Sequence, residues 1–278
     1  MSEKVVVITG ATSGVGEVAA DRLAAKGYRI NFIARDSVRG EETLKHLRAI
    51  AGGVGHRAFY ADLSRLSEMK RVAAEIAAAE PEIDVLVNNA GALFNTRKVT
   101  EDGLEMTFAL NHMSYFVVTN LLRPNLKADG RVVSTASGAH KGARLDFSDL
   151  QSQRGYSGFG AYGRSKLCNI LFTRELARRL QGSGITANCL HPGFVATRFG
   201  DQSGGMLALA VRAAKTFALS PEQGAETIIY LASSPEAANV TGTYFYKCRP
   251  ATPTREAQND ADARRLWEIS AEIAGMPE

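Results

Sequence analysis

Short β-branched runs alternate with longer segments of helical periodicity along most of the chain. The runs that predict strands are residues 4–9, 29–34, 56–60, 83–88, 130–135, 184–190 and 241–247. The segments between them that predict helices are residues 14–26, 39–51, 66–79, 103–122, 162–180 and 221–233. Strands joined by helices in this way indicate right-handed βαβ crossovers and a parallel sheet. The strands are almost wholly apolar, as expected when helices cover both faces of the sheet.

No repeat, low-complexity tract or linker divides the 278 residues, of which 45% are apolar. We therefore predict one α/β domain over residues 1–278, a doubly wound sheet of seven mainly parallel strands. Residues 138–160 and 194–220 interrupt the alternation, and loops of this length in a compact domain are usually lids or binding loops. Residues 259–274 predict a short amphipathic helix that carries Trp267 and packs on the edge of the domain.

Charge, cysteine pattern and hydropathy argue against a nucleic-acid partner, a metal site and a membrane span. The net charge is +4, and no stretch gathers five or six like charges, so no nucleic-acid partner is expected. The cysteines, Cys168, Cys189 and Cys248, form no CxxC or metal-ligand pattern, which favours reduced thiols in a cytoplasm and no metal site. A strand begins too early for a signal peptide, and residues 206–211 are far shorter than the ~20 residues of a membrane span. We expect a soluble cytoplasmic protein.

A glycine-rich turn lies between the first strand and the first helix. It contains Gly10, Thr12, Ser13, Gly14, Val15 and Gly16. Gly10 permits a tight turn, Gly14 lets backbone N–H groups approach a pyrophosphate, and Gly16 allows the helix to pack closely. The N-terminus of that helix attracts an anion. The spacing is GxxxGxG, not GxGxxG, and a plain structural turn is the alternative, but its position predicts a Rossmann-type nucleotide site.

The end of the second strand bears on which nucleotide binds. An acidic residue there commonly binds the ribose 2′-hydroxyl of NAD, but Ala34 stands at that place and Arg35 follows. A guanidinium can bind the 2′-phosphate of NADP(H) through bidentate hydrogen bonds. Asp36 would favour NAD(H) if the alignment slipped by one residue, or it caps the next helix. We predict NADP(H), with NAD(H) as the less favoured cofactor.

Tyr162 and Lys166 are four residues apart and therefore share one face of a predicted helix. An ammonium one turn away favours the phenolate and lowers the tyrosine pKa from about 10. Such a tyrosine can give a proton to a carbonyl oxygen or take one from an alcohol. A surface pair of no chemical role is the alternative, and the other motifs of the chain decide between the two.

Those motifs together resemble the short-chain dehydrogenase/reductase family through about Tyr246. Besides the glycine turn and the Tyr162/Lys166 pair, they comprise Asp62 and Leu63 after the third strand, Asn88, Asn89, Ala90 and Gly91 after the fourth, Asn111 in a helix, Ser137 after the fifth strand, and Pro192 and Gly193 after the sixth. The resemblance implies an oxidoreductase that moves a hydride between nicotinamide and a carbonyl or alcohol carbon.

The resemblance also implies roles for single residues. Tyr162 would be the acid/base, Ser137 would position the substrate oxygen, Lys166 would bind the nicotinamide ribose and tune Tyr162, and Asn111 would support a proton relay. The remaining residues implied to bind the cofactor are Asp62 and Leu63 near the adenine, Asn89, Ala90 and Gly91 along its edge, and Pro192, Gly193, Val195 and Thr197 near the carboxamide. For Asp62 helix capping is an alternative, and for Asn111 a buried structural amide is.

The 25 positions between Ser137 and Tyr162 exceed the separation in many family members and resemble the retinol dehydrogenase branch. A scaffold insertion would explain them equally well. Apolar residues in the second long loop, Met206, Leu207 and Leu209 among them, would line a pocket for a fairly apolar aldehyde, ketone, retinoid or steroid, or would pack on the sheet. Two other functions stay open: a non-catalytic NADP(H)-sensing module, and an epimerase or dehydratase. By resemblance we expect a homo-oligomer, dimer or tetramer, that pairs through helices 103–122 and 162–180.

Overall fold

The computed structural model describes residues 3–194 and 219–276 of the chain. Its strands are β1 (Val5–Thr9), β2 (Arg29–Ala34), β3 (Arg57–Tyr60), β4 (Ile83–Asn88), β5 (Leu126–Thr135), β6 (Thr186–Leu190), β7 (Tyr244–Tyr246) and β8 (Arg249–Pro250). They form one sheet in the order β3-β2-β1-β4-β5-β6-β7-β8. Strands β1 to β7 pair in parallel, and β8 is antiparallel to β7. All seven predicted strands are therefore confirmed, and β8 is an addition.

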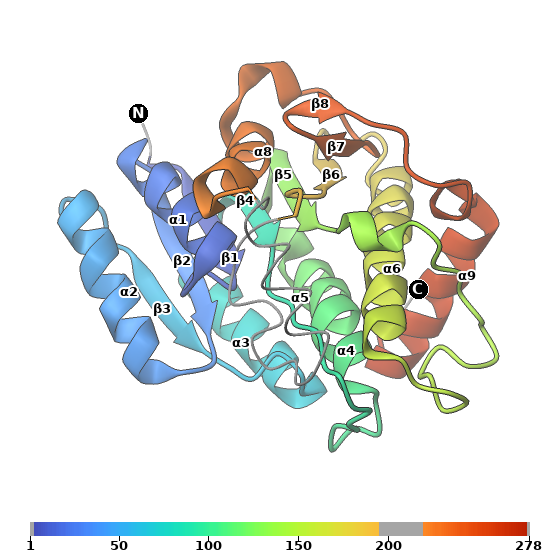
Figure 1. Cartoon of the computed structure of the whole chain (residues 1–278). Coiled ribbons are helices and arrows are strands. Elements are labelled where there is room, and N and C mark those ends of the chain that lie inside the picture. The colour runs from blue at the N-terminus through green and yellow to red at the C-terminus, as the bar shows by residue number, and fades with distance from the viewer. Residues whose placement is uncertain (1–2, 195–218, 277–278) are drawn as a thin grey trace.

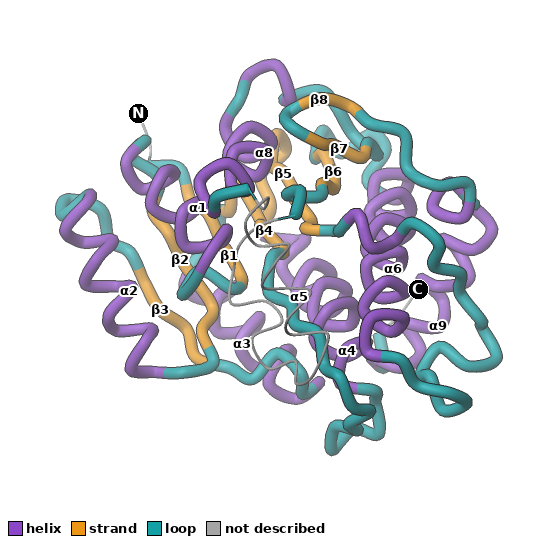
Figure 2. Tube along the Cα trace, viewed as in Figure 1, coloured by secondary structure: helices purple, strands orange, loops and turns teal. Residues whose placement is uncertain are grey.

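Helices cover both faces of this sheet (Figures 1 and 2). They are α1 (Gly14–Ala25), α2 (Ser37–Ile50), α3 (Leu66–Ala79), α4 (Met106–Phe108), α5 (Ser114–Leu122), α6 (Gly158–Arg179), α8 (Pro221–Ser233) and α9 (Asp260–Ala274). Buried residues of α1, α2 and α8 form one apolar cluster, and those of α3, α5, α6 and α9 form another. The predicted doubly wound α/β fold is confirmed.

Successive side chains of a central strand belong alternately to the two apolar clusters. In β1, Val6 and Ile8 join the cluster of α1 and α8, whereas Val7 joins the cluster of α3 and α5. Successive side chains of a strand point to opposite faces, so both sets must be apolar when both faces are covered. That requirement explains the unbroken apolar run at the start of the chain.

The strand order reverses between β1 and β4, because β2 follows β1 on one side and β5 follows β4 on the other. In open α/β sheets a ligand binds at such a reversal, beyond the carboxyl ends of the strands. The glycine turn after β1 and the residues after β4 meet at this place. The topology thus selects one edge of the sheet for the functional site.

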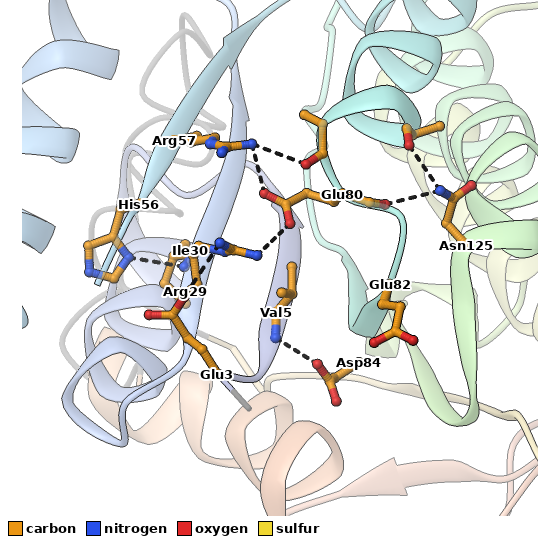
Figure 3. A network of polar contacts seen from close by, with 12 residues as sticks. Glu3, Val5, Arg29, Ile30, His56, Arg57, Glu80, Glu82, Asp84 and Asn125 are labelled. Atoms are coloured by element: carbon orange, nitrogen blue, oxygen red, sulfur yellow. Dashed lines mark hydrogen bonds and ion pairs between the residues drawn. The ribbon is translucent and has the colours of Figure 1, made fainter. Parts of the chain in front are cut away.

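The opposite edge is held by charged side chains (Figure 3). Glu80, only 1% exposed, ends α3 and accepts hydrogen bonds from Arg29 Nη2 at 2.7 Å and Arg57 Nη1 at 3.1 Å. Asp84 accepts one from the backbone of Val5 at 2.7 Å. Since Arg29 and Arg57 begin β2 and β3, the network joins α3 to the amino ends of these strands, far from the expected ligand edge.

The predicted helix over residues 103–122 is interrupted in the structure. Helix α4 passes into a π-helical turn, Ala109–Met113, before α5 begins. The predicted helix 162–180 begins earlier, at Gly158, where the Ser157 side chain accepts a hydrogen bond from Gly160 and caps α6. Part of the first long loop is therefore helical.

Helix α9 packs along α6 on the outer side of the sheet's second helix layer (Figure 1). The Trp267 ring stacks on Phe172 of α6 at 5.8 Å between centroids and meets Phe116 of α5 at 4.9 Å. The expected pairing of two copies through helices 103–122 and 162–180 would need this surface. In the structure α9 packs on part of it, along α6 and through Trp267 on Phe116, and the homo-oligomer stays a prediction. None of the helices within residues 3–194 and 219–276 combines the length and apolarity needed to span a bilayer.

Candidate active site

The glycine turn after β1 is tightly packed against the segment after β4. Gly10 has φ +71° and Gly14 has φ +61°, a region that favours glycine. A Cβ on Gly16 would lie 2.1 Å from the Gly10 carbonyl oxygen and 2.4 Å from Asn89 Nδ2. Ser13 precedes α1 without a side-chain cap, so the first N–H groups of this helix are left for an anion. Thr12, Ser13 and Gly14 remain partly or fully open at this point, while Val15 is buried.

Asn89 fastens the turn to the sheet. Its Nδ2 donates to the carbonyl oxygens of Thr9 and Gly10, each at 3.2 Å, and its Oδ1 accepts from Thr135 at 3.3 Å. The Thr9 hydroxyl oxygen accepts from the backbone N–H groups of Asn89 and Ala90 at 2.9 Å. The Asn89 side chain is therefore occupied in holding the turn, and any contact with a cofactor falls to its exposed neighbours.

Arg35 and Asp36 differ clearly in what they contact. Asp36 caps α2, because its Oδ1 accepts a hydrogen bond from the Arg39 backbone at 2.9 Å. Arg35 is exposed directly after β2 ends at Ala34, and no described residue accepts a hydrogen bond from its side chain. The capping alternative for Asp36 is thus realised, and the guanidinium of Arg35 is the group available at this strand end.

Asp62 and Leu63 follow β3 as expected. Asp62 Oδ1 accepts hydrogen bonds from the backbone and the hydroxyl of Ser64, at 3.0 and 2.8 Å, which shapes the turn before α3. The Leu63 side chain is buried in the core. One Asp62 oxygen is therefore engaged in the turn, and the residue itself is half-buried.

Asn111 lies in the π-helical turn and is completely buried. Its Oδ1 accepts from the Ala92 backbone and its Nδ2 donates to the Ala92 carbonyl, both at 2.9 Å; Nδ2 also donates to Ser165 Oγ at 3.0 Å. The side chain thereby ties the segment after β4 to α6. Interruptions of this kind in a helix occur frequently at functional sites.

Ser137 and Tyr162 meet beyond the end of β5. The Ser137 hydroxyl oxygen accepts a hydrogen bond from the Ala139 backbone at 3.1 Å and is hydrogen bonded with the Tyr162 side chain. Burial raises the pKa of Tyr162 to about 12, and the hydrogen bond with Ser137 opposes this in part. Burial thus outweighs the lowering that sequence reasoning expected from a nearby ammonium.

Lys166 is 3% exposed, and its Nζ donates to the Thr135 carbonyl at 2.9 Å. The Nζ atom lies 5.6 Å from the centre of the Tyr162 ring. A Cβ on Gly91 would lie 3.4 Å from Nζ and 3.1 Å from Asn111 Oδ1. Burial lowers the pKa of Lys166 to about 7. Lys166, Tyr162, Ser137, Asn111 and Gly91 therefore converge on one place, as predicted from motifs up to 75 positions apart (166 minus 91).

The segment after β6 is only partly described. Pro192 and Gly193 are half-buried, and Gly193 has φ +87°. Its backbone N–H donates to His191 Nδ1 at 3.2 Å. Val195 and Thr197, and with them most of the predicted loop 194–220, lie outside the described residues.

Sequence reasoning missed two contributors to this site, the Thr135 carbonyl and Ser165. The Thr135 carbonyl accepts from Lys166 and, at 3.4 Å each, from Tyr115 and Asn169. Ser165 receives the Asn111 amide and donates to the Tyr162 carbonyl at 2.7 Å. A backbone acceptor carries no side-chain signal, but Ser165 stands between Tyr162 and Lys166 and its position offered one.

These residues fit a dinucleotide. The uncapped N–H groups at the start of α1 would hold a phosphate, the Arg35 guanidinium is available at the end of β2, and the buried Lys166 amine lies beside Gly91. A diphosphate at the helix N-terminus and a ribose near Lys166 would span the carboxyl edge of the sheet.

Comparison with known proteins agrees with this geometry. The profile described as short chain dehydrogenase matches residues 4–207. Mouse retinol dehydrogenase 14 is 40% identical over 295 residues, covering 99% of this chain and 87% of that protein. Human retinol dehydrogenase 13 is 40% identical over 281 residues, covering 98% and 85%.

Two solved structures are similar to this chain over most of its length. A crystal structure of a Mycobacterium paratuberculosis protein superposes with a TM-score of 0.79 at 32% identity, covering 99% of this chain and 94% of that one. A short-chain dehydrogenase from Burkholderia cenocepacia, crystallised in complex with NADP, gives a TM-score of 0.71 at 27% identity, covering 87% and 94%.

Proposed function

The chain belongs to the short-chain dehydrogenase family, and from that premise we propose that it is an NADP(H)-dependent enzyme for a fairly apolar alcohol or carbonyl compound. As a member of this family it is an oxidoreductase that uses a nicotinamide cofactor. The observation that carries the proposed chemistry is the convergence of Ser137, Tyr162 and Lys166 beside Gly91. The specific cofactor and the substrate class rest on separate arguments.

The preference for NADP(H) rests on Arg35. Its side chain is exposed at the end of β2, where a 2′-phosphate would add two negative charges, and a guanidinium can bind phosphate through two parallel hydrogen bonds. Asp36, the residue that would favour NAD(H), is engaged as the cap of α2. The NADP in the Burkholderia relative agrees with this preference.

Tyr162 is the group proposed to move the proton. The bound nicotinamide supplies or accepts the hydride. In reduction, the Tyr162 hydroxyl donates its proton to the substrate oxygen as negative charge develops there. Ser137 accepts from the Ala139 backbone and is hydrogen bonded with Tyr162, so a substrate oxygen that enters between the two hydroxyls would accept from both and be held beside Tyr162. A positively charged Lys166 stabilises the phenolate that remains.

Burial prepares this pair for proton transfer. A tyrosine with its pKa raised to about 12 holds its proton firmly, which suits an acid that waits for charge to develop on a carbonyl oxygen. Lys166, whose pKa is lowered to about 7, gains a proton easily once a negative charge appears nearby. Charge on either residue is thus favoured mainly when the other carries the opposite charge.

The relatives named retinol dehydrogenases support an apolar, retinoid-like substrate for this chain. Phe159, 63% exposed in the first turn of α6 and three positions before Tyr162, and Phe194, 54% exposed after β6, offer apolar surface. We propose an aldehyde or ketone with an extended hydrocarbon portion, or the corresponding alcohol.

Fluorescence titration with NADPH and NADH tests the cofactor proposal. We expect NADPH to bind at least tenfold more tightly, Arg35→Ala to abolish that difference, and Arg39→Ala, an exposed arginine one helical turn later, to retain it. Equal binding of both nucleotides by the wild-type protein would contradict the assignment to Arg35.

The membership of the chain in an oxidoreductase family disfavours the non-catalytic sensing module. It predicts NADPH binding without consumption of NADPH in the presence of any aldehyde. All three reactive side chains are present and gathered together, and this favours turnover. The epimerase or dehydratase alternative has no comparable support in the site.

A further inference from the structure

His112 is a buried polar residue that the proposed chemistry does not use. It is 0% exposed and lies in the π-helical turn Ala109–Met113, directly after Asn111. Its ring is surrounded by Phe108, at 5.2 Å between ring centres, and Phe172, at 6.3 Å. An imidazole in such a place needs a hydrogen-bond partner, because an unpaired buried N–H is costly.

The partner comes from the other end of the chain. His112 Nε2 lies 2.9 Å from Ser270 Oγ, across 158 positions of sequence, and Ser270 is also 0% exposed. The Ser270 hydroxyl donates to the Leu266 carbonyl at 2.7 Å, so its oxygen is left to accept. Burial lowers the pKa of His112 to about 3, against a smaller raising effect of a hydrogen bond with Asn169, and the ring is therefore neutral near pH 7. A proton on Nε2 matches the acceptor that Ser270 offers.

This hydrogen bond gives α9 a defined register against the helices that it covers. Other contacts of α9 are apolar, such as Trp267 on Phe116 and Phe172, cation–π, such as Arg179 over Trp267 at 4.5 Å, or exposed, such as the Arg174–Asp260 ion pair at 2.8 Å. Apolar surfaces tolerate sliding, whereas a buried donor and acceptor must meet at one position. The His112–Ser270 bond therefore fixes the π-helical turn relative to α9.

The π-helical turn also sets the position of Asn111, which lies within it. The Asn111 amide holds the backbone of Ala92 and the hydroxyl of Ser165, which precedes Lys166. Gly91 stands next to both Asn111 Oδ1 and Lys166 Nζ. A change in the position of the turn would be passed directly to the segment after β4 and to α6.

We propose that Ser270 is a positioning residue: through its hydrogen bond to His112, helix α9 holds Asn111 in the arrangement that the active site requires. The proposal rests on the proposed function, in which Asn111 and Lys166 serve catalysis. It assigns to the C-terminal helix a role in turnover besides that of covering α5 and α6. Neither Ser270 nor His112 touches the substrate in this account.

Two single variants and their combination test the proposal. Ser270→Ala removes the hydroxyl that accepts from His112. His112→Phe places an aromatic ring among Phe108 and Phe172 that needs no hydrogen bond, and the double variant combines the two changes. Each is assayed for kcat with NADPH and all-trans-retinal, for NADPH affinity, and for hydrogen exchange of the Ala92 amide, which donates to Asn111. Trp267→Phe is the matched control, since Trp267 Nε1 has no hydrogen-bond partner among the described residues and the change alters ring packing and the contact with the Arg179 guanidinium while keeping both His112 and Ser270.

We expect Ser270→Ala to lower kcat about tenfold, because small displacements of supporting residues are costly in catalysis. NADPH affinity should stay within twofold, since the glycine turn and Arg35 lie elsewhere. Exchange of the Ala92 amide should rise about tenfold, and the double variant should lose no more activity than the worse single variant. Trp267→Phe should lower the melting temperature while leaving kcat and Ala92 exchange within twofold.

Two results would overturn the proposal. One is a fall in kcat and a rise in exchange for Ser270→Ala no larger than for Trp267→Phe; the other is additive losses in the double variant. Wild-type protein that binds NADPH but turns over no aldehyde would refute the proposed function instead, and the exchange of the Ala92 amide would still decide whether Ser270 holds Asn111.

Discussion

The buried ammonium of Lys166 should make the protein less stable as the pH falls. Its pKa lies at about 7 in the folded protein and at 10.5 ordinarily, so the unfolded chain binds this proton more tightly. Between these two values the unfolded state carries the extra proton, and the free energy of unfolding must fall as the pH decreases. Below pH 7 both states are protonated and the full cost of the buried charge is present.

The size of the effect follows from the two pKa values. A difference of about 3.5 corresponds to roughly 5 kcal/mol, at about 1.36 kcal/mol for each pKa unit. From pH 9 to pH 6 the contribution of Lys166 should change by about 2.5 kcal/mol. Lys166→Met keeps most of the buried stem and removes the charge, so it should lack this part of the pH dependence.

Urea unfolding of nucleotide-free protein at pH 6 and pH 9 measures the effect. The wild-type protein should lose about 2.5 kcal/mol more than Lys166→Met between pH 9 and pH 6. Lys45→Met, at an exposed lysine of α2, should follow the wild type. Identical pH dependence in the wild type and Lys166→Met would refute the view that Lys166 is held in a site that disfavours its charge.

Three further expectations concern the scaffold. Gly16→Ala would place a methyl group 2.1 Å from the Gly10 carbonyl oxygen, so it should cost about 2–3 kcal/mol in urea unfolding and weaken NADPH binding at least tenfold, while Gly53→Ala, with open space around it, should do neither. Glu80→Gln should lower the free energy of unfolding by about 2 kcal/mol and leave kcat unchanged, since Arg29 and Arg57 lose a buried partner but keep some exposure; no loss of stability would show that the ion pairs contribute nothing. Because α9 covers α5 and α6, active protein should sediment with the 29.9 kDa mass of one chain, and activity sedimenting at twice that mass would contradict this expectation.

Most of the fold was predictable from the sequence because strands β1 to β7 are short apolar runs that can be recognised locally. The apolar run of β1 and the glycine turn that follows fixed the first βα unit, and the parallel order of the sheet followed from the helices between strands. Strand β8 escaped prediction since it has two residues, and the turn before it uses Lys247 and Cys248 at φ +49° and +58°. Glycine or asparagine would be the usual signal for such a turn.

The part of the site that consists of motif residues was predictable from the sequence. Tyr162, Lys166, Ser137 and Asn111 lie together as their order in the chain implied, and Asp36 proved to be a helix cap. Two features could not be read from the sequence. The first is the pair of shifted pKa values: burial raises the pKa of Tyr162 and lowers that of Lys166. Burial arises only when the core is assembled, so no local pattern indicates it.

The second unpredictable feature is the contact between His112 and Ser270. Neither residue belongs to a local pattern that names the other, because 158 positions separate them. The π-helical turn that presents His112 is likewise a tertiary result, since the sequence there favours a continuous helix. Pairings of this kind are set by how α9 docks on α5 and α6.

We propose that this chain transfers a hydride from NADPH to an apolar carbonyl compound with Tyr162 as the acid. The most direct measurement is the loss of NADPH absorbance when purified protein meets all-trans-retinal, decanal and a 3-ketosteroid, with Tyr162→Phe in parallel. We predict turnover of at least one of these compounds, and a fall of a thousandfold or more in Tyr162→Phe with NADPH binding retained. Tight NADPH binding by the wild type without turnover of any of them would refute the proposed reaction, and full activity in Tyr162→Phe would refute Tyr162 as the acid.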